Sequence, residues 1–180
     1  MEALIAEVPA EILSVNEAKT GVFNTEEAAS LAPESVRDEV AAFLSEYNHE
    51  FRAGISIDNA SCDLQTVPYL NITYTVDAFA STDDAALALA DARAFSALNA
   101  ELGNPSDVET LDYPIYSQTV TACEGDATRA VTVWQRGRYV ITAEAVFPVD
   151  SPAPADLWLT QATGIVFERI FSDMLRRELR

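Results

Sequence analysis

Three residues in the sequence could carry thiol or imidazole chemistry: Cys62, Cys123 and the single histidine, His49. A thiolate nucleophile needs a general base, and His49 could serve either cysteine in that role. However, His49 falls in the polar segment 47–50 at the end of a predicted helix, and neither cysteine lies in a nucleophile motif. We therefore predict a solvated histidine at a helix end and no catalytic residue.

Both cysteines lie in polar segments that are typical of strand-to-turn junctions, 59–63 and 121–126. An even number of cysteines in a composition of extracellular type predicts one disulfide, Cys62–Cys123. Closing a loop of that span would stabilise the fold by about 4 kcal/mol in the chain-entropy treatment. Two free cytosolic thiols are the alternative.

Metal sites are not predicted. Zinc needs several histidine or cysteine ligands, and the chain has three such residues in all. Calcium needs only oxygen ligands, and two clusters could supply some, namely Asp58, Asn59 and Asp63, and Glu124 with Asp126. Neither cluster has the spacing or the glycine of an EF-hand loop, so both are interpreted as turns.

The adjacent carboxylates Glu26/Glu27 and Asp83/Asp84 could in principle form acid–base pairs. Both pairs fall in the predicted first turns of helices, where acidic side chains favour the helix dipole, so catalysis is not predicted for either. The sequence also lacks a nucleophile elbow, a phosphate-binding glycine loop and a dinucleotide fingerprint. We expect no cofactor.

The net charge of the chain is −18, from 29 acidic and 11 basic residues. Such a surface repels nucleic acid and anionic membranes, so neither is an expected partner. The charge is uneven, with 12 acidic and 3 basic residues in 1–60, 9 and 1 in 61–120, and 8 and 7 in 121–180. Lys19 is the only lysine.

One predicted hairpin tip carries positive charge beside two aromatic rings: Trp134, Arg136, Arg138 and Tyr139. Arginine and aromatic residues are common interface anchors, so this tip is the candidate interaction site for an acidic protein partner or a second copy. The alternative is an exposed tip that arginine keeps soluble, with the two rings packed across the strands.

Hydrophobic periodicity predicts the elements that must position these residues. Helices are predicted over 36–51, 82–102 and 152–180; strands over 55–58, 67–79 and 113–123; and a hairpin over 129–147 that turns at 135–138. Residues 1–24 are interpreted as an N-terminal leader or linker and residues 25–180 as a single domain. Similar strand-to-helix junctions at 75–79 and 142–147 suggest two related ββα halves, with chance similarity as the alternative.

This order predicts an α+β fold, with a mostly antiparallel sheet of about five strands and three helices packed mainly on one face. The leading functional hypothesis is a noncatalytic extracytoplasmic binding or accessory domain, such as the soluble part of a bacterial lipoprotein or envelope complex. A small-ligand sensor or carrier is the alternative, which an apolar pocket of several hundred cubic ångströms would favour. A carboxylate-based enzyme comes third and needs carboxylates converging in a cleft.

No secretory signal or membrane span is visible in the sequence, so direct membrane insertion is not expected. An extracytoplasmic location would therefore depend on an N-terminal signal or anchor removed from this chain. A cytoplasmic location is the alternative, and it needs no such signal or anchor.

Overall fold

The computed structural model describes residues 13–62, 69–94, 104–105 and 115–149. Its strands are β1 (Leu13–Val15), β2 (Gly21–Asn24), β3 (His49–Asn59), β4 (Asn71–Phe79), β5 (Asn104–Pro105), β6 (Ile115–Ala122), β7 (Gly125–Arg136) and β8 (Tyr139–Pro148). Its α-helices are α2 (Thr25–Ser30), α3 (Arg37–Glu46) and α4 (Thr82–Ala90), and its 3₁₀ turns are η1 (Glu17–Lys19) and η2 (Glu34–Val36).

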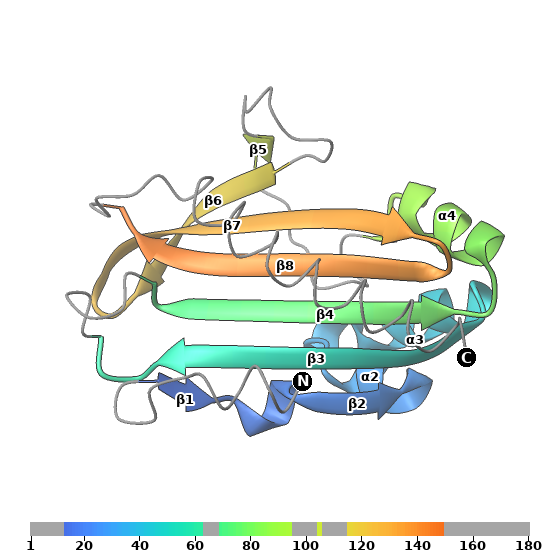
Figure 1. The fold of residues 1–180 in the computed structure, drawn as a ribbon, viewed down its shortest axis with the longest axis horizontal. Coiled ribbons are helices and arrows are strands. Elements are labelled where there is room, and N and C mark those ends of the chain that lie inside the picture. Colours follow the sequence, from blue (N-terminus) through green and yellow to red (C-terminus); the bar gives the residue numbers. More distant parts are fainter. Residues whose placement is uncertain (1–12, 63–68, 95–103, 106–114, 150–180) are drawn as a thin grey trace, which may run out of the picture.

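The strands form one antiparallel sheet in the order β1-β3-β4-β8-β7-β6-β5, and β2 also pairs with β3 (Figure 1). The predicted α+β class and antiparallel sheet are confirmed. The sheet has more strands than the five expected, because short strands pair at its edges. Residues 13–24, within the segment interpreted as a leader, supply β1 and β2 to the edge of β3.

The three described α-helices cover one face of the sheet, as predicted, and lie at the end where β4 leads into α4 (Figure 1). We call this the helix face. Its strand residues include Arg52 and Gly54 of β3, Thr75 and Asp77 of β4, and Thr142 of β8. The predicted helix over 152–180 lies outside the described residues.

Local signals explain where the helices begin. Asn24 and Glu27 form a reciprocal capping box at the start of α2. The Ser81 side chain accepts a hydrogen bond from the backbone N–H of Asp84 at the start of α4. The carboxylates of Glu26/Glu27 and Asp83/Asp84 therefore lie in first helical turns, as expected.

The core has a part on each face of the sheet. On the helix face, buried residues of α2, α3 and α4 pack against the sheet, namely Ala28, Val40, Phe43, Leu44, Ala85 and Ala88 against Phe79, Val131, Val133 and Val140. On the opposite face, Ile72, Ala130, Trp134, Ile141 and Phe147 are buried.

Candidate ligand-binding pocket

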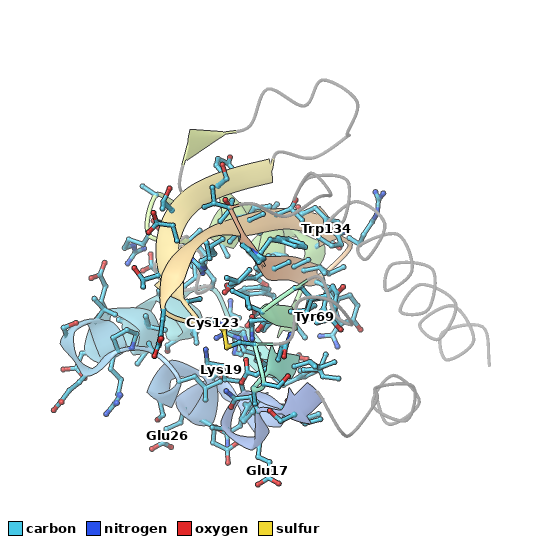
Figure 2. The ribbon with its side chains drawn as sticks, turned by 90° about the vertical axis from the view of Figure 1, so that its left-hand side faces the viewer. Glu17, Lys19, Glu26, Tyr69, Cys123 and Trp134 are labelled. Atoms are coloured by element: carbon cyan, nitrogen blue, oxygen red, sulfur yellow. A yellow bond between two sulfur atoms is a disulfide. The ribbon has the colours of Figure 1, made fainter. Side chains whose placement is uncertain are left out.

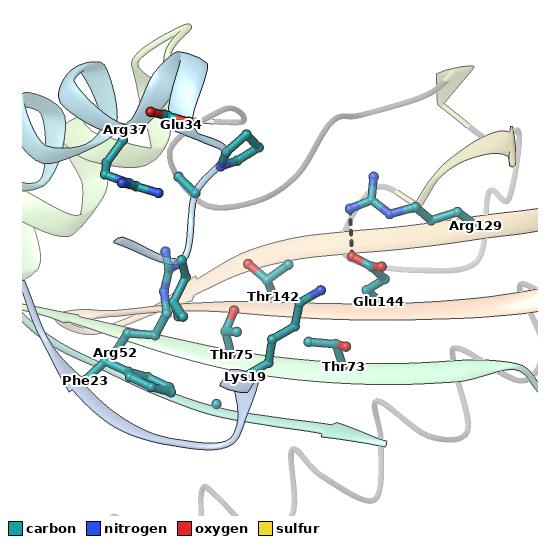
Figure 3. A pocket seen from close by; sticks show the side chains of 14 residues that line it. Lys19, Phe23, Glu34, Arg37, Arg52, Thr73, Thr75, Arg129, Thr142 and Glu144 are labelled. Carbon is teal, nitrogen blue, oxygen red and sulfur yellow. Dashed lines mark hydrogen bonds and ion pairs between the residues drawn. The ribbon is translucent and has the colours of Figure 1, made fainter. Parts of the chain in front are cut away.

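A pocket of about 510 Å³ lies on the helix face, beside α2 and α3 (Figure 3). Its described lining residues come from the sheet, from η1 and from the α2–η2–α3 segment: Lys19, Phe23, Leu31, Ala32, Pro33, Glu34, Arg37, Arg52, Gly54, Thr73, Thr75, Arg129, Thr142 and Glu144. It is of the size of a small-molecule site, but it is not the apolar pocket that the sensor hypothesis called for.

Strand register builds the floor of this pocket. Gly54 of β3 lies opposite Thr75 of β4, which lies opposite Thr142 of β8. Two pairs further along, Thr73 lies opposite Glu144. Because alternate residues of a strand share a face, these side chains all point to the helix face. Figure 3 shows the threonine side chains rising from the sheet toward the segment above.

The η1 segment lies along the edge of β3 between β1 and β2 and carries Lys19 into the pocket. The Asn16 N–H donates to the Ser56 carbonyl at 2.9 Å, and the Ser56 N–H donates to Thr20 Oγ1 at 3.0 Å. These bonds hold the segment against β3 on both sides of Lys19. The backbone can lie this close because residue 54 is glycine: a Cβ there would come within 2.9 Å of the Lys19 carbonyl oxygen.

Gly54→Ala is therefore expected to push the Lys19 segment away from the sheet and to lower the free energy of unfolding by about 1–3 kcal/mol, the usual cost of overpacking. Chemical denaturation measures this directly. Gly125→Ala is the matched control, since a Cβ there meets nothing within 4 Å and should change stability little. Equal effects of the two substitutions would contradict the close approach.

A buried polar network lies behind the pocket floor. Arg52 Nε donates to Asp77 Oδ1 at 2.8 Å, and His49 Nε2 lies 3.0 Å from the same oxygen. The Thr25 hydroxyl donates to the His49 carbonyl at 2.8 Å and lies 3.1 Å from His49 Nδ1. The side chains of His49 and Asp77 are fully buried, and Arg52 is 2% exposed. The network ties the start of α2 to β3 and β4.

Burial by itself raises the pKa of Asp77, but the charge of Arg52 and the hydrogen bonds from His49 and Arg52 outweigh it, so the pKa lies below its ordinary value. Asp77 is therefore a carboxylate, which can only accept hydrogen bonds. It follows that His49 Nε2 carries a proton and that Nδ1 faces the Thr25 hydroxyl.

The prediction of a solvated His49 at a helix end is wrong. Helix α3 ends at Glu46, and Asn48 adopts a positive φ of 53° that turns the chain into β3. His49 is the first residue of that strand and is 7% exposed. The apolar spacing that predicted a helix to residue 51 continues by coincidence into the strand.

Thr25, His49 and Asp77 have the order of hydroxyl, imidazole and carboxylate found in nucleophilic triads. Here the imidazole is fully buried, and the Thr25 hydroxyl donates its hydrogen bond to the His49 carbonyl oxygen. Asp77 Oδ1 is also shared with Arg52. These contacts are those of a structural network.

Two hydroxyls on the pocket floor are buried without a partner. Thr75 Oγ1 and Thr142 Oγ1 have no hydrogen-bond partner among the described residues, although Thr142 is 5% exposed as a residue. A buried hydroxyl without a partner costs free energy in the folded state. Such an arrangement is typical of sites where a ligand supplies the missing acceptor.

Thr142→Val is expected to leave the free energy of unfolding unchanged or to raise it by up to about 1 kcal/mol, because the substitution removes a hydroxyl that has no partner. Thr25→Val is the matched control: it removes a hydroxyl with two partners and should cost about 1–2 kcal/mol. Urea denaturation of both variants tests this. A larger loss for Thr142→Val than for Thr25→Val would show that the Thr142 hydroxyl is bonded.

The described lining includes four of the 11 basic residues of the chain but two of its 29 acidic residues. Arg129 donates to Glu144 at 2.7 Å, and Arg52 is paired with Asp77. Lys19 and Arg37 are exposed and make no ion pair within the part of the chain that the structure describes. The pocket is thus a positive spot on a strongly acidic molecule.

The predicted disulfide between Cys62 and Cys123 is present, with Cα atoms 6.0 Å apart. Both residues adopt positive φ, in line with their predicted turn positions. The bond joins the turn after β3 to the β6–β7 turn, at the end of the sheet away from the helices (Figure 1).

The hairpin of β7 and β8 turns at Gly137 and Arg138, as predicted. Trp134 is 7% exposed and lies on the side of the sheet away from α2 and α3 (Figure 2). Arg138 pairs with Glu50, donates to the Phe79 carbonyl and lies 5.0 Å from the Tyr139 ring centre. Arg136 is exposed. Docking of a partner through this hairpin tip stays a prediction. Because Trp134 is buried, it cannot serve as a surface anchor there.

In the described part of the chain, no group of three or more histidine, cysteine, aspartate or glutamate residues is arranged to hold a metal ion. No helix there is long and apolar enough to cross a membrane.

Comparisons with known proteins give little further. No protein-family model matches the chain, and no curated protein matches it in sequence. Among solved structures, the extracellular domain of PknH from Mycobacterium tuberculosis is similar over 81% of this chain and 79% of that chain, with 10% identity and a TM-score of 0.36. At that score the likeness carries no argument about fold or function.

Proposed function

We propose that this chain is an extracytoplasmic binding domain without catalytic activity, and that a small molecule binds in the pocket between the sheet and the α2–η2 segment. The observation that carries this proposal is the polar floor of the pocket, where Thr75 and Thr142 present buried hydroxyls without partners. The sheet, η1 and the α2–η2–α3 segment all contribute to the lining of the pocket, as is usual for small-molecule sites.

The extracytoplasmic location is supported by the Cys62–Cys123 disulfide, since such bonds persist in oxidising compartments and are rare in the cytosol. Alkylation of the protein during lysis, without reductant, tests it: full-length protein expressed in its own host should show no free thiol. Two free thiols in that sample would remove the support for export and leave the pocket proposal standing.

The binding proposal is tested by thermal unfolding against a mixed panel of organic acids, amines, sugars, amino acids and nucleosides. We expect one compound class to raise the unfolding midpoint of the wild type. Two pocket-filling variants, Thr73→Phe from the floor and Leu31→Trp from the opposite wall, should fold by circular dichroism and abolish that rise. No stabilising compound, or equal stabilisation of both filled variants, would contradict the proposal.

A further inference from the structure

We infer that the ligand of this pocket is a small organic anion, with an oxyanion group bound at Lys19 and the hydroxyls of Thr75 and Thr142 and an apolar body against the Leu31–Pro33 part of the lining; this rests on the proposed function. The shared chemistry is that of a carboxylate or a phosphate ester. Three features of the pocket point to this class.

The first feature is charge. The Lys19 ammonium and the Arg37 guanidinium enter the pocket from different segments, η1 and the start of α3, and neither has an ion-pair partner among the described residues. In Figure 3 the Lys19 side chain rises from the sheet near Thr75 and Thr142, whereas the Arg37 side chain lies above the sheet, near the helices. In a chain with one lysine and a charge of −18, a pocket lined by two cations without ion-pair partners among the described residues favours an anionic ligand.

The second feature is the floor. The hydroxyls of Thr75 and Thr142 come from neighbouring strands at paired positions, so they lie side by side. A hydroxyl can donate to an oxyanion, and charge-assisted bonds of that kind are stronger than neutral ones. Arg52 also lines this floor, where its charge is balanced by Asp77.

The third feature is the apolar wall. Leu31, Ala32 and Pro33, from the segment between α2 and η2, and Phe23 of β2 give the lining its apolar part. An inorganic ion would leave this wall unused, whereas the body of an organic acid would cover it. Two carboxylates also line the pocket, but Glu144 is paired with Arg129, and Glu34 is exposed at the rim.

Benzoate and phenyl phosphate are suitable probes, because they share a ring and differ in the oxyanion; benzamide is the uncharged analogue. Calorimetric or ligand-observed NMR titration should show that one or both anions bind at least about tenfold more tightly than benzamide, the ratio expected of one charge-assisted contact. The anion that binds more tightly indicates whether the natural ligand carries a carboxylate or a phosphate ester.

Charge variants test the residues. Lys19→Met should weaken binding of the preferred anion by about tenfold or more, and Arg37→Met should weaken it less, because Arg37 lies at the start of α3 and not at the floor formed by Thr75 and Thr142. Glu34→Gln should leave binding unchanged or tighten it. Arg136→Met removes the same charge from the exposed hairpin tip and should change affinity little, which makes it the matched control.

The outcomes separate this inference from the proposed function. Benzamide binding as tightly as benzoate, lost in Thr73→Phe but unaffected by Lys19→Met, would overturn the anionic class and leave the pocket as a binding site. No binding of either anion at millimolar concentration would also overturn the class. Anion binding that survives both Thr73→Phe and Leu31→Trp would place the ligand elsewhere and overturn both proposals.

Discussion

Asp77→Asn is expected to lower the free energy of unfolding by about 3–5 kcal/mol at neutral pH, the usual cost of breaking a buried ion pair by removing one partner. The substitution keeps the size and an acceptor oxygen but removes the charge that Arg52 faces, and Arg52 is 2% exposed. Equilibrium denaturation measures the loss.

Glu50→Gln is the matched control. It breaks the Arg138–Glu50 pair, whose side chains are 32% and 46% exposed, and should cost about 0–1 kcal/mol because solvent screens that pair. A loss for Asp77→Asn no greater than for Glu50→Gln would contradict the buried network.

The effect of Asp77 also depends on pH. Its pKa is lower in the folded than in the unfolded chain, so its ionisation stabilises the fold above the unfolded-state value and loses that effect as pH falls through the folded value. The wild type should therefore lose stability on acidification below about pH 4, the ordinary range of an aspartate. Asp77→Asn should show a smaller loss over the same range, and parallel curves would contradict the assignment.

Removing the disulfide is the second large effect. Cys62→Ser combined with Cys123→Ser should lower the free energy of unfolding by about 4 kcal/mol, because the bond closes a loop across a separation of 61 residues and so restricts the unfolded chain. Wild type unfolded in the presence of reductant is the control and should match the double variant. A loss below about 1 kcal/mol in both would show that residual structure already restrains the unfolded chain.

Much of the fold could be predicted from sequence because it rests on local patterns. The β7–β8 hairpin alternates apolar and polar residues around Gly137, which adopts the positive φ that its turn requires. Ser81 and the acidic residues after it mark the start of α4. The Cys62–Cys123 bond followed from the count and context of the two cysteines.

The pocket could not be predicted in the same way, because it depends on contacts between distant segments. Lys19 lies in the segment interpreted as a leader, and its position follows from backbone bonds to Ser56 and from the missing side chain at Gly54. The alternating polar residues of β4 can be recognised in the sequence. However, polar residues on one side of a strand usually face solvent, so the pattern does not predict a pocket. That Asp77 is buried instead depends on Arg52 and His49, which no periodicity connects to it.

Two signals could have drawn attention to the pocket. One is the placement of the single lysine just before Thr20-Gly21, between two short apolar segments. The other is the run of polar residues at alternate positions 71–77, opposite an apolar series, in a strand that other strands flank on both sides. Each signal alone also fits an ordinary surface segment. Only the strand register shows that the two segments line one pocket.

The single lysine permits one direct test of anion binding in the pocket. Reductive methylation with ¹³C-formaldehyde labels Lys19 and the α-amino group of the chain, keeps both positive, and gives one reporter inside the site and one reference. Titration with benzoate or phenyl phosphate should shift the Lys19 methyl resonance to saturation while the α-amino resonance stays in place, and benzamide should shift the Lys19 resonance only at concentrations at least about tenfold higher. A Lys19 resonance that does not respond to either anion, or that moves only in step with the α-amino resonance, would contradict anion binding at this site.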